Sequence, residues 1–262
     1  MTEAAAAGRS RAWMPARSRA GMPSRCHVIA RREVAASVHL LAITGGGPFL
    51  AGQNVNLALA PSGPARSYSV ASGPADPVLD VLFDVVPGGL LTPRLAALQA
   101  GDPLYVSPAF GGFLDDERPA TWIAAGTGVA PFASMVRSGL AADKILVHAS
   151  RSPAGFHFRE LFAARLGPRY FCCRPGAAGP PGAAEVQGAM EVQGAAGVEG
   201  AVGPAGVEGV RAGGLISWIQ SSELPPDRRY LLCGSARMVV EVREALLARG
   251  VPFANVLAEI YF

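Results

Sequence analysis

The sequence has few cysteines and few charged residues. Its cysteines are Cys26, Cys172, Cys173 and Cys233, and charged residues make up 16% of the chain. The cysteines form no CxxC pair and have no spacing suited to zinc or an iron-sulfur cluster, so neither kind of metal centre is expected. Reduced thiols of this kind are typical of a cytoplasmic protein, where disulfides are rare.

Long apolar runs and a strong excess of one charge are missing as well. The apolar runs are too short to span a bilayer and are interrupted by Gly, Pro or charged residues, so no transmembrane helix is expected. The net charge is only +3, and arginines crowd the beginning of the chain. No basic stripe interleaved with aromatic residues follows, which argues against a nucleic-acid-binding protein.

Two segments have compositions unlike a packed core. Residues 1–25 are rich in Ala, Arg and Ser, and we expect a disordered basic tail. An organelle transit peptide, or a start at Met22, are the alternatives. Residues 176–214 have glycine at nearly every third position, but proline is scarce and the period is broken, which argues against a collagen-like triple helix. We interpret this segment as a flexible insertion in the second domain.

Residues 26–117 have the pattern of a small antiparallel β-barrel. Short strands separated by Gly and Pro turns predict such a barrel. Two strands are expected within 26–43, and further strands at 49–60, 65–72, 78–86 and 104–106. A helix is expected at 93–99, with Thr92 as its N-cap and Pro93 at its first position.

Residues 118–262 change to alternating strands and helices. Strands are expected at 122–125, 144–149, 169–173, 229–233 and 256–262, and helices at 131–140, 159–166, 215–220 and 237–249. Such alternation indicates a doubly wound parallel sheet. The predicted fold is therefore two-domain, with an antiparallel β-barrel followed by an α/β domain.

A turn between the first strand and the first helix of this second domain is the main candidate for binding an anion. The apolar strand leads into Gly126, Thr127 and Gly128, and Pro131 follows near the start of the helix. Glycines let the backbone approach a ligand, and a helix N-terminus favours an anion such as a pyrophosphate. A plain strand-to-helix connection is the alternative. Residues 88–92 form a second candidate of the same kind.

The expected strand at 65–72 carries an arginine among small and apolar residues. Arg66, Tyr68 and Val70 fall on one face, and Ser67 and Ser69 on the other. An arginine in this setting suggests an anion lying over the strand. The alternative is a surface arginine on an edge strand.

Five short motifs, taken together, resemble the ferredoxin-NADP reductase family. They are RSYS at 66–69, GGLLT at 88–92, GTGVAPF at 126–132, CG at 233–234 and EIYF at 259–262. Each motif is weak alone, but their order and spacing are compatible with the family. The resemblance covers about residues 26–262 apart from the insertion, and GGLLTPRL looks bacterial in style.

This resemblance implies a flavin-binding barrel and an NADP-binding domain. Hydride would pass between nicotinamide and flavin N5, and single electrons would pass to or from ferredoxin or flavodoxin. Arg66 would pair with the FAD pyrophosphate, Tyr68 would lie against the isoalloxazine ring, and Ser69 would hydrogen-bond near N5. Gly89, Leu90 and Thr92 would offer further donors to the pyrophosphate.

The resemblance also assigns residues of the second domain. Gly126, Thr127, Gly128 and Pro131 would hold the NADP phosphates. Cys233 would line the nicotinamide site, although a buried strand cysteine is the common alternative. Glu259 would polarise or protonate at the junction of flavin and nicotinamide.

The remaining assignments concern the terminal ring and the choice of dinucleotide. Either Tyr261 or Phe262 would cover the flavin, and the bacterial style favours Phe262. Arg151 and Arg174 stand where a 2′-phosphate would be held, which favours NADP over NAD. His148, in the same region, is interpreted as a packed histidine.

The functional hypothesis is a cytoplasmic, monomeric ferredoxin-NADP reductase-like flavoenzyme that uses FAD and NADP(H). Its partner would be a ferredoxin or a flavodoxin that binds transiently. One alternative is the reductase component of an oxygenase or of another flavin-linked complex. The other is a non-catalytic nucleotide-binding scaffold, in which the insertion mediates assembly.

Overall fold

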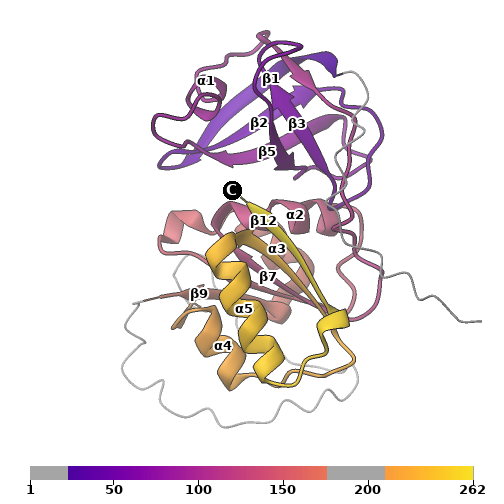
Figure 1. The fold of residues 1–262 in the computed structure, drawn as a ribbon, viewed down its shortest axis with the longest axis vertical. Helices are drawn as coiled ribbons and strands as arrows, with labels where there is room; N and C mark the ends of the chain where they lie inside the picture. The colour runs from indigo at the N-terminus through magenta and orange to yellow at the C-terminus, as the bar shows by residue number, and fades with distance from the viewer. Residues whose placement is uncertain (1–22, 176–209, 262) are drawn as a thin grey trace, which may run out of the picture.

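The computed structural model describes residues 23–175 and 210–261 of the chain, which form two stacked units. A barrel of antiparallel strands lies above a parallel sheet covered by helices (Figure 1). The two predicted classes of domain, and their order, are confirmed. None of the helices in the described ranges is long and apolar enough to cross a membrane.

The first sheet is a six-stranded antiparallel barrel. Its strands are β1 (Ser24–Ala35), β2 (Val38–Thr44), β3 (Asn54–Ala58), β4 (Arg66–Ser69), β5 (Val78–Asp84) and β6 (Pro103–Val106). They pair in the order β4-β3-β6-β1-β2-β5. A bridge between Val70 and Val81 joins the two outer strands, and the N–H of Ala71 donates to the Asp80 carbonyl at 2.8 Å. Because the outer strands meet, the sheet closes around its core.

The start of β1 corrects the expected tail. Ser24 and Arg25, which were expected to be disordered, pair with Val106 and Tyr105 of β6. Backbone hydrogen bonds extend the strand to two residues before Cys26, its first buried side chain. The side chains of these two residues are polar, so the apolar pattern of the sequence does not predict this extension.

The short helix of the barrel also differs from the prediction. Helix α1 (Thr92–Leu95) has four residues, and its N-cap is Leu91 without a side-chain capping bond. The Thr92 hydroxyl is buried and accepts instead from the N–H of Val86 at 2.8 Å. The prediction of Thr92 as N-cap was therefore wrong, because this side chain stabilises the end of β5.

The second sheet is parallel throughout. Its strands are β7 (Ala120–Ala125), β8 (Lys144–Ala149), β9 (Tyr170–Arg174), β10 (Val210–Ala212), β11 (Arg229–Ser235) and β12 (Val256–Tyr261). The helices are α2 (Ala130–Arg137), α3 (Arg159–Leu166), α4 (Leu215–Ser221) and α5 (Ala236–Ala248), with 3-10 turns η1 (Gly126–Val129), η2 (Pro153–Gly155), η3 (Gly167–Arg169) and η4 (Phe253–Asn255).

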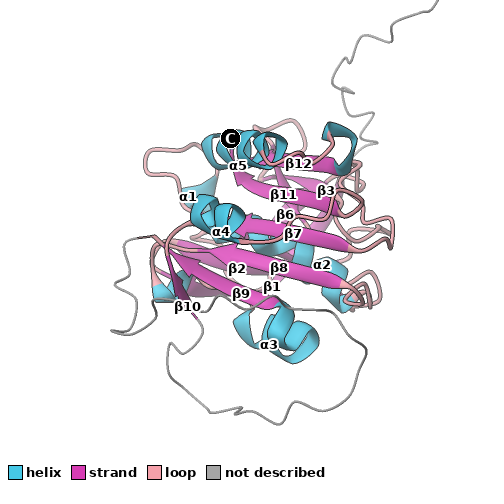
Figure 2. Cartoon of the chain, turned by 90° about the horizontal axis from the view of Figure 1, so that it is seen from below, coloured by secondary structure: helices cyan, strands magenta, loops and turns pink. Residues whose placement is uncertain are grey.

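Helices cover both faces of this sheet. Trp122 packs on one face in a cluster with Phe132 and Phe162 of α2 and α3, whereas Ile123 packs on the other with Trp218 and Val239 of α4 and α5. Figure 2 shows the two helix pairs on opposite sides. The strand order is β10-β9-β8-β7-β11-β12, so the chain reverses direction across the sheet between β7 and β11. In doubly wound sheets, ligands bind at the carboxyl edge beside such a reversal.

Strand β10 corrects the bounds of the predicted insertion. Residues 210–212, expected within a flexible segment, pair in parallel with 172–174 of β9 at the edge of the sheet. A three-residue edge strand is held by backbone hydrogen bonds, so the glycine-rich composition does not reveal it. Residues 176–209 lie outside the described part of the chain, and so does most of the expected tail.

A buried ion pair fixes the segment that joins the two domains. Lys144 of β8 contacts Asp115 at 2.6 Å, and both side chains are 1% exposed. The Trp122 indole donates to the other carboxylate oxygen of Asp115 at 3.0 Å. The connection therefore enters the sheet at a defined position beside β7.

Candidate active site

Polar side chains from both domains meet at the end of β12. Glu259 of β12 accepts from the Ser69 hydroxyl of β4 at 2.8 Å, and from the side-chain amide of Asn54 of β3. The Tyr261 hydroxyl donates to the Ser69 oxygen at 2.7 Å. The Cys233 sulfur of β11 lies 3.8 Å from the same Glu259 oxygen that Ser69 contacts. We refer to these residues as the junction cluster.

Strand pairing explains why residues so distant in sequence meet. Cys233 and Glu259 are direct partners in the pairing of β11 with β12, and Asn54 and Ser69 are partners in the pairing of β3 with β4. The end of β12 reaches the barrel (Figure 1). The predicted residues Ser69, Cys233, Glu259 and Tyr261 therefore lie together, while their catalytic roles stay predictions.

Burial governs the ionisation of the cluster. Desolvation raises the pKa of Glu259 above its ordinary value, and the hydrogen bonds from Asn54, Ser69 and Cys233 partly offset this shift. Burial, together with the nearby Glu259 carboxylate, raises the pKa of the Cys233 thiol well above its usual value. Burial also raises the pKa of Tyr261, with smaller contributions from Cys233 and Glu259. Cys233 is therefore a neutral thiol and not a thiolate nucleophile, and Glu259 is the carboxyl group of the cluster.

The predicted anion-binding turn lies beside this cluster, at the reversal of the sheet. Gly126 has φ +54°, and a Cβ added there would meet open space. At Gly128, a Cβ would lie 2.3 Å from the Cys233 carbonyl oxygen, so only glycine lets η1 approach β11 this closely. Pro131 is buried in the first turn of α2. The backbone of this turn is thus exposed on one side and packed against the cluster strand on the other.

An acidic residue of the barrel contacts this turn. The Thr127 hydroxyl donates to the carboxylate of Asp84, the last residue of β5, at 2.9 Å. Asp84 is exposed, and the buried His157 lies close enough for the two charges to interact. A carboxylate therefore contacts the hydroxyl that the sequence assigns to a phosphate.

Arg66 and Tyr68 lie on β4 beside Ser69. Arg66 is exposed and donates to the carbonyl of Ala65 at 2.9 Å, with no carboxylate partner among the described residues. The Tyr68 hydroxyl is buried and lacks a hydrogen-bond partner in the described part of the chain. Burial raises the pKa of Tyr68 to about 12 despite the nearby Arg66 charge. A ligand with an anionic group and a polar group could pair with the Arg66 guanidinium and hydrogen-bond to the Tyr68 hydroxyl.

The second candidate anion site has fewer free donors than expected. The N–H of Gly89 donates to the Val86 carbonyl at 2.9 Å, so it is already used within the turn. Leu90 is 73% exposed, and the Thr92 hydroxyl accepts one bond but can still donate its proton. Gly89 therefore shapes the turn and does not supply a donor here.

The predicted 2′-phosphate arginines follow neighbouring strands. Arg151 is exposed just beyond β8, and Arg174 is the half-buried last residue of β9. Because Ala149 and Cys173 pair in the sheet, both arginines lie at the same carboxyl edge. His148 is fully buried, as the packed interpretation requires, and burial lowers its pKa to about 3. Phe262 lies outside the described residues, so the choice between Tyr261 and Phe262 as flavin cover is open.

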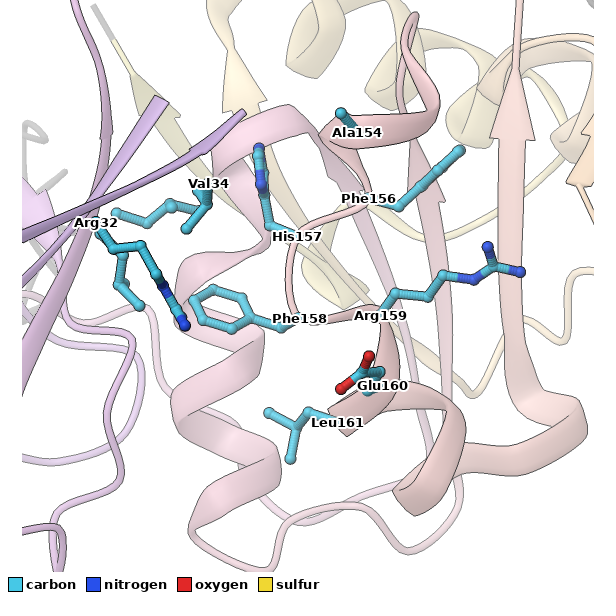
Figure 3. Close-up of a pocket in the computed structure, with 11 residues that line it drawn as sticks. Arg32, Val34, Ala154, Phe156, His157, Phe158, Arg159, Glu160 and Leu161 are labelled. Atoms are coloured by element: carbon cyan, nitrogen blue, oxygen red, sulfur yellow. The ribbon is translucent and has the colours of Figure 1, made fainter. Parts of the chain in front are cut away.

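A cavity of about 380 Å³ lies elsewhere between the domains. It is lined by β1, β2 and β5 on one side and by the segment 154–161 on the other. Figure 3 shows Phe158 pointing toward Arg32 and Arg159 pointing away. None of the predicted site residues lines this cavity. Its volume therefore does not mark the candidate site, which is defined by the junction cluster and the neighbouring turn.

Two residues of the site were missed by the sequence analysis. Asn54 contacts Glu259, and Asp84 contacts Thr127, each from a barrel strand. Gln53-Asn54 follows a glycine bend, and Asp84 ends an apolar strand, but neither feature indicates a partner in the other domain. Only the docking of the two domains reveals them.

The fold and the site together define a class of two-domain proteins in which an antiparallel barrel meets the switch point of a doubly wound parallel sheet. Solved structures share this fold. A ferredoxin NADP+ reductase from Neisseria gonorrhoeae with bound FAD and NADP superposes with a TM-score of 0.74, at 19% identity over 92% of this chain and 100% of that one. A phthalate dioxygenase reductase gives 0.65, at 20% identity over 91% of this chain and 68% of the other.

Sequence relatives extend the likeness. No family model matches the chain. Flavodoxin/ferredoxin-NADP reductase of Escherichia coli (strain K12) is 39% identical over 125 residues, which are 44% of this chain and 50% of the relative. The toluate 1,2-dioxygenase electron transfer component of Pseudomonas putida is 37% identical over 91 residues, 34% of this chain and 27% of the relative. The chain thus spans about half the length of the E. coli relative and about a quarter of the toluate 1,2-dioxygenase component. Its resemblance to ferredoxin-NADP reductases is confirmed.

Proposed function

We propose that the chain is an FAD-dependent oxidoreductase that passes a hydride between NADP(H) and flavin N5. The observation that supports this best is the junction cluster, in which Ser69 of the barrel contacts Glu259 beside Cys233 at the carboxyl edge of the parallel sheet. The relatives named as flavodoxin/ferredoxin-NADP reductases point to the same reaction.

The residues at β4 fit a flavin. Arg66 has no carboxylate partner among the described residues. The Tyr68 hydroxyl is buried and has no hydrogen-bond partner among the same residues. When bound, FAD would accept two electrons as hydride and release them singly. In the proposal, Arg66 holds the pyrophosphate, Tyr68 covers the ring and Ser69 donates near N5. The Thr92 hydroxyl and the backbone of Gly89 and Leu90 shape the other side of the same site.

The second domain would bind NADP(H) across its carboxyl edge. Gly126, Thr127, Gly128 and Pro131 form the turn for the phosphates, and Arg151 and Arg174 stand where they could pair with the 2′-phosphate. Cys233, neutral because it is buried, excludes water beside the nicotinamide. Glu259 holds or moves a proton at its carboxylate, and Tyr261 or Phe262 must leave the flavin face when nicotinamide enters.

The electrons would pass to or from a ferredoxin or flavodoxin, in a monomeric cytoplasmic enzyme of the ferredoxin-NADP reductase type. A second candidate is the reductase component of an oxygenase, because a toluate dioxygenase electron transfer component and an aromatic O-demethylase reductase subunit are among the relatives. Comparing ferredoxin with small dyes as electron acceptors separates the two candidates.

A visible spectrum of the purified chain tests the proposal. After reconstitution with FAD, the protein should show flavin absorption that NADPH bleaches at lower concentration than NADH. A chain that stays colourless after reconstitution would sink both enzyme candidates and leave the scaffold alternative.

A further inference from the structure

Two successive rungs of the β3–β4 pairing carry the same pair of residue types. Asn56 pairs with Ser67, and two residues along the strand Asn54 pairs with Ser69. Residues two apart on a strand share a face, so the two rungs lie on one face of the pair, although Ser69 is buried and Ser67 is exposed. They nevertheless make different hydrogen bonds.

The Asn56 rung is closed on itself. The Ser67 hydroxyl donates to the Asn56 side-chain oxygen at 2.7 Å. The Asn54 rung is open, because its two side chains both donate to Glu259 of the second domain. Asn54 contacts one carboxylate oxygen, and Ser69 contacts the other at 2.8 Å. The carboxylate has thus taken the place of the hydrogen bond within the rung.

The barrel holds the Asn54 amide in position for this contact. The backbone of Asn54 exchanges hydrogen bonds with Phe110 at 2.8 and 2.9 Å, and its strand partner is Ser69. At Gly111, which has φ +104°, an added Cβ would lie only 3.3 Å from the amide nitrogen. Glycine therefore leaves room for the NH₂ group beside Glu259. The opposite amide orientation would direct an oxygen at the carboxylate, which is repulsive.

We propose that Asn54 is a positioning residue, which forms with Ser69 a two-donor clamp from the barrel that grips ionised Glu259. Both donors favour the carboxylate over the neutral acid, because a carboxylate accepts at both oxygens. The clamp fixes the carboxylate beside Cys233 and holds the carboxyl edge of the second domain against the barrel. Its effect on catalysis rests on the proposed function, whereas its effect on domain docking does not.

Few other groups in the cluster can obscure the titration of Glu259. The titratable groups facing it are Cys233 on β11 and Tyr261 on β12, and the barrel side presents the neutral Asn54 and Ser69. Cys233 and Tyr261 both have raised pKa values, so they stay protonated near neutral pH. A pH effect that depends on Asn54 therefore reports on Glu259.

The test compares Asn54→Ala with Asn56→Ala, which removes the same side chain from the neighbouring rung. With the FAD-reconstituted full chain, NADPH-driven ferricyanide reduction is followed against pH. Asn54→Ala should raise the apparent pKa of the carboxylate limb by about one pH unit, since a charge-assisted bond is lost. Asn56→Ala should leave it unchanged. Coincident profiles for the two variants would overturn the clamp.

A second variant, Asn54→Asp, has nearly the same shape as the wild-type side chain. It keeps the test decisive if Asn54→Ala does not fold. It places a second carboxylate beside Glu259, so the apparent pKa should rise further than with alanine. An unchanged profile for this variant would likewise contradict the proposal.

Thermal melting gives a readout that needs no activity. Because burial raises the pKa of Glu259 above 4.5, the stability it contributes is lost as pH rises through the raised value. Removing Asn54 raises the pKa further, so the melting temperature of Asn54→Ala should fall increasingly below that of wild type as pH rises through the raised pKa of Glu259. A gap independent of pH, as expected for Asn56→Ala, would refute the clamp. If wild type takes up no FAD, the proposed function fails, but melting still decides the clamp.

Discussion

Two contacts join the domains at the carboxyl edge of the parallel sheet, and each involves a carboxylate. They differ in which domain supplies that carboxylate. At the junction cluster, Glu259 of the second domain accepts from Asn54 and Ser69 of the barrel. At the glycine turn, Asp84 of the barrel accepts from Thr127 of the second domain. Glu259 is half-buried with several donors, whereas Asp84 is exposed with one. Under the proposed function, the first contact would persist during turnover, and the second contact would break when a phosphate reaches the turn.

The largest effect is expected at the persistent contact. Replacing Glu259 by Gln keeps the shape but removes the carboxyl group that is proposed to exchange a proton. Turnover of NADPH-driven dye reduction should fall about 100-fold, the lower range for loss of a general acid or base. Flavin content should not change, since no flavin-binding role is assigned to this side chain.

Glu241→Gln is the control for this change. Glu241 lies on α5, where its exposed carboxylate faces Arg237 at 3.7 Å, and it is not part of the junction cluster. It should retain wild-type turnover. Equal rates for Glu259→Gln and Glu241→Gln would remove Glu259 from the catalytic role.

The next effect concerns Arg66 on β4, next to Ser69 of the first contact in the same strand. If Arg66 holds the FAD pyrophosphate, Arg66→Ala loses charge-assisted hydrogen bonds worth about 1.5–3 kcal/mol. FAD affinity, measured by titration of the apoprotein, should then weaken about 10- to 100-fold. Arg25→Ala, another exposed arginine of the barrel, should bind FAD like wild type. An unchanged FAD affinity in Arg66→Ala would show that Arg66 is a surface residue without a role in FAD binding.

The same comparison shows where sequence patterns are informative. The barrel, the alternating second domain and the cluster residues Ser69, Cys233 and Glu259 follow from periodicity and from motifs that are local in sequence. Asn54 and Asp84 have no such motif, because each one acts through docking with a strand or turn far along the chain. Thr92 was assigned wrongly for a related reason, since its hydroxyl bonds to Val86 and not to the helix it begins.

The third effect breaks the second contact. Asp84→Asn removes a negative charge from the turn proposed to bind the NADP phosphates. A like charge about 5 Å from a phosphate at the surface costs on the order of 1 kcal/mol. The KM for NADPH should therefore fall about 3- to 10-fold, while turnover stays unchanged. Asp227→Asn, in the loop before β11 at the opposite edge, is the matched control, and a raised KM in Asp84→Asn would mean that Asp84 assists binding.

The smallest effect compares the sign of the pH dependence at Glu259 with the sign at His148, a buried residue beside the glycine turn. Burial, with a smaller contribution from the nearby His157, lowers the pKa of His148 to about 3 beside the glycine turn. The unfolded chain therefore binds a proton there that the folded chain refuses, and stability falls as pH drops below about 6.5. At Glu259 the raised pKa makes stability fall as pH rises.

Melting curves at neighbouring pH values measure this difference. From pH 7 to pH 6, titration of His148 should cost less than about 1 kcal/mol, or roughly 2 °C in a chain of this size. His148→Gln should flatten this acid slope, and Glu259→Gln should flatten the slope on the alkaline side only. His27→Gln, an exposed histidine of β1, should change neither. If His148→Gln and Glu259→Gln altered the same limb, the two residues would belong to one titrating network, and the opposite signs assigned to them would be wrong.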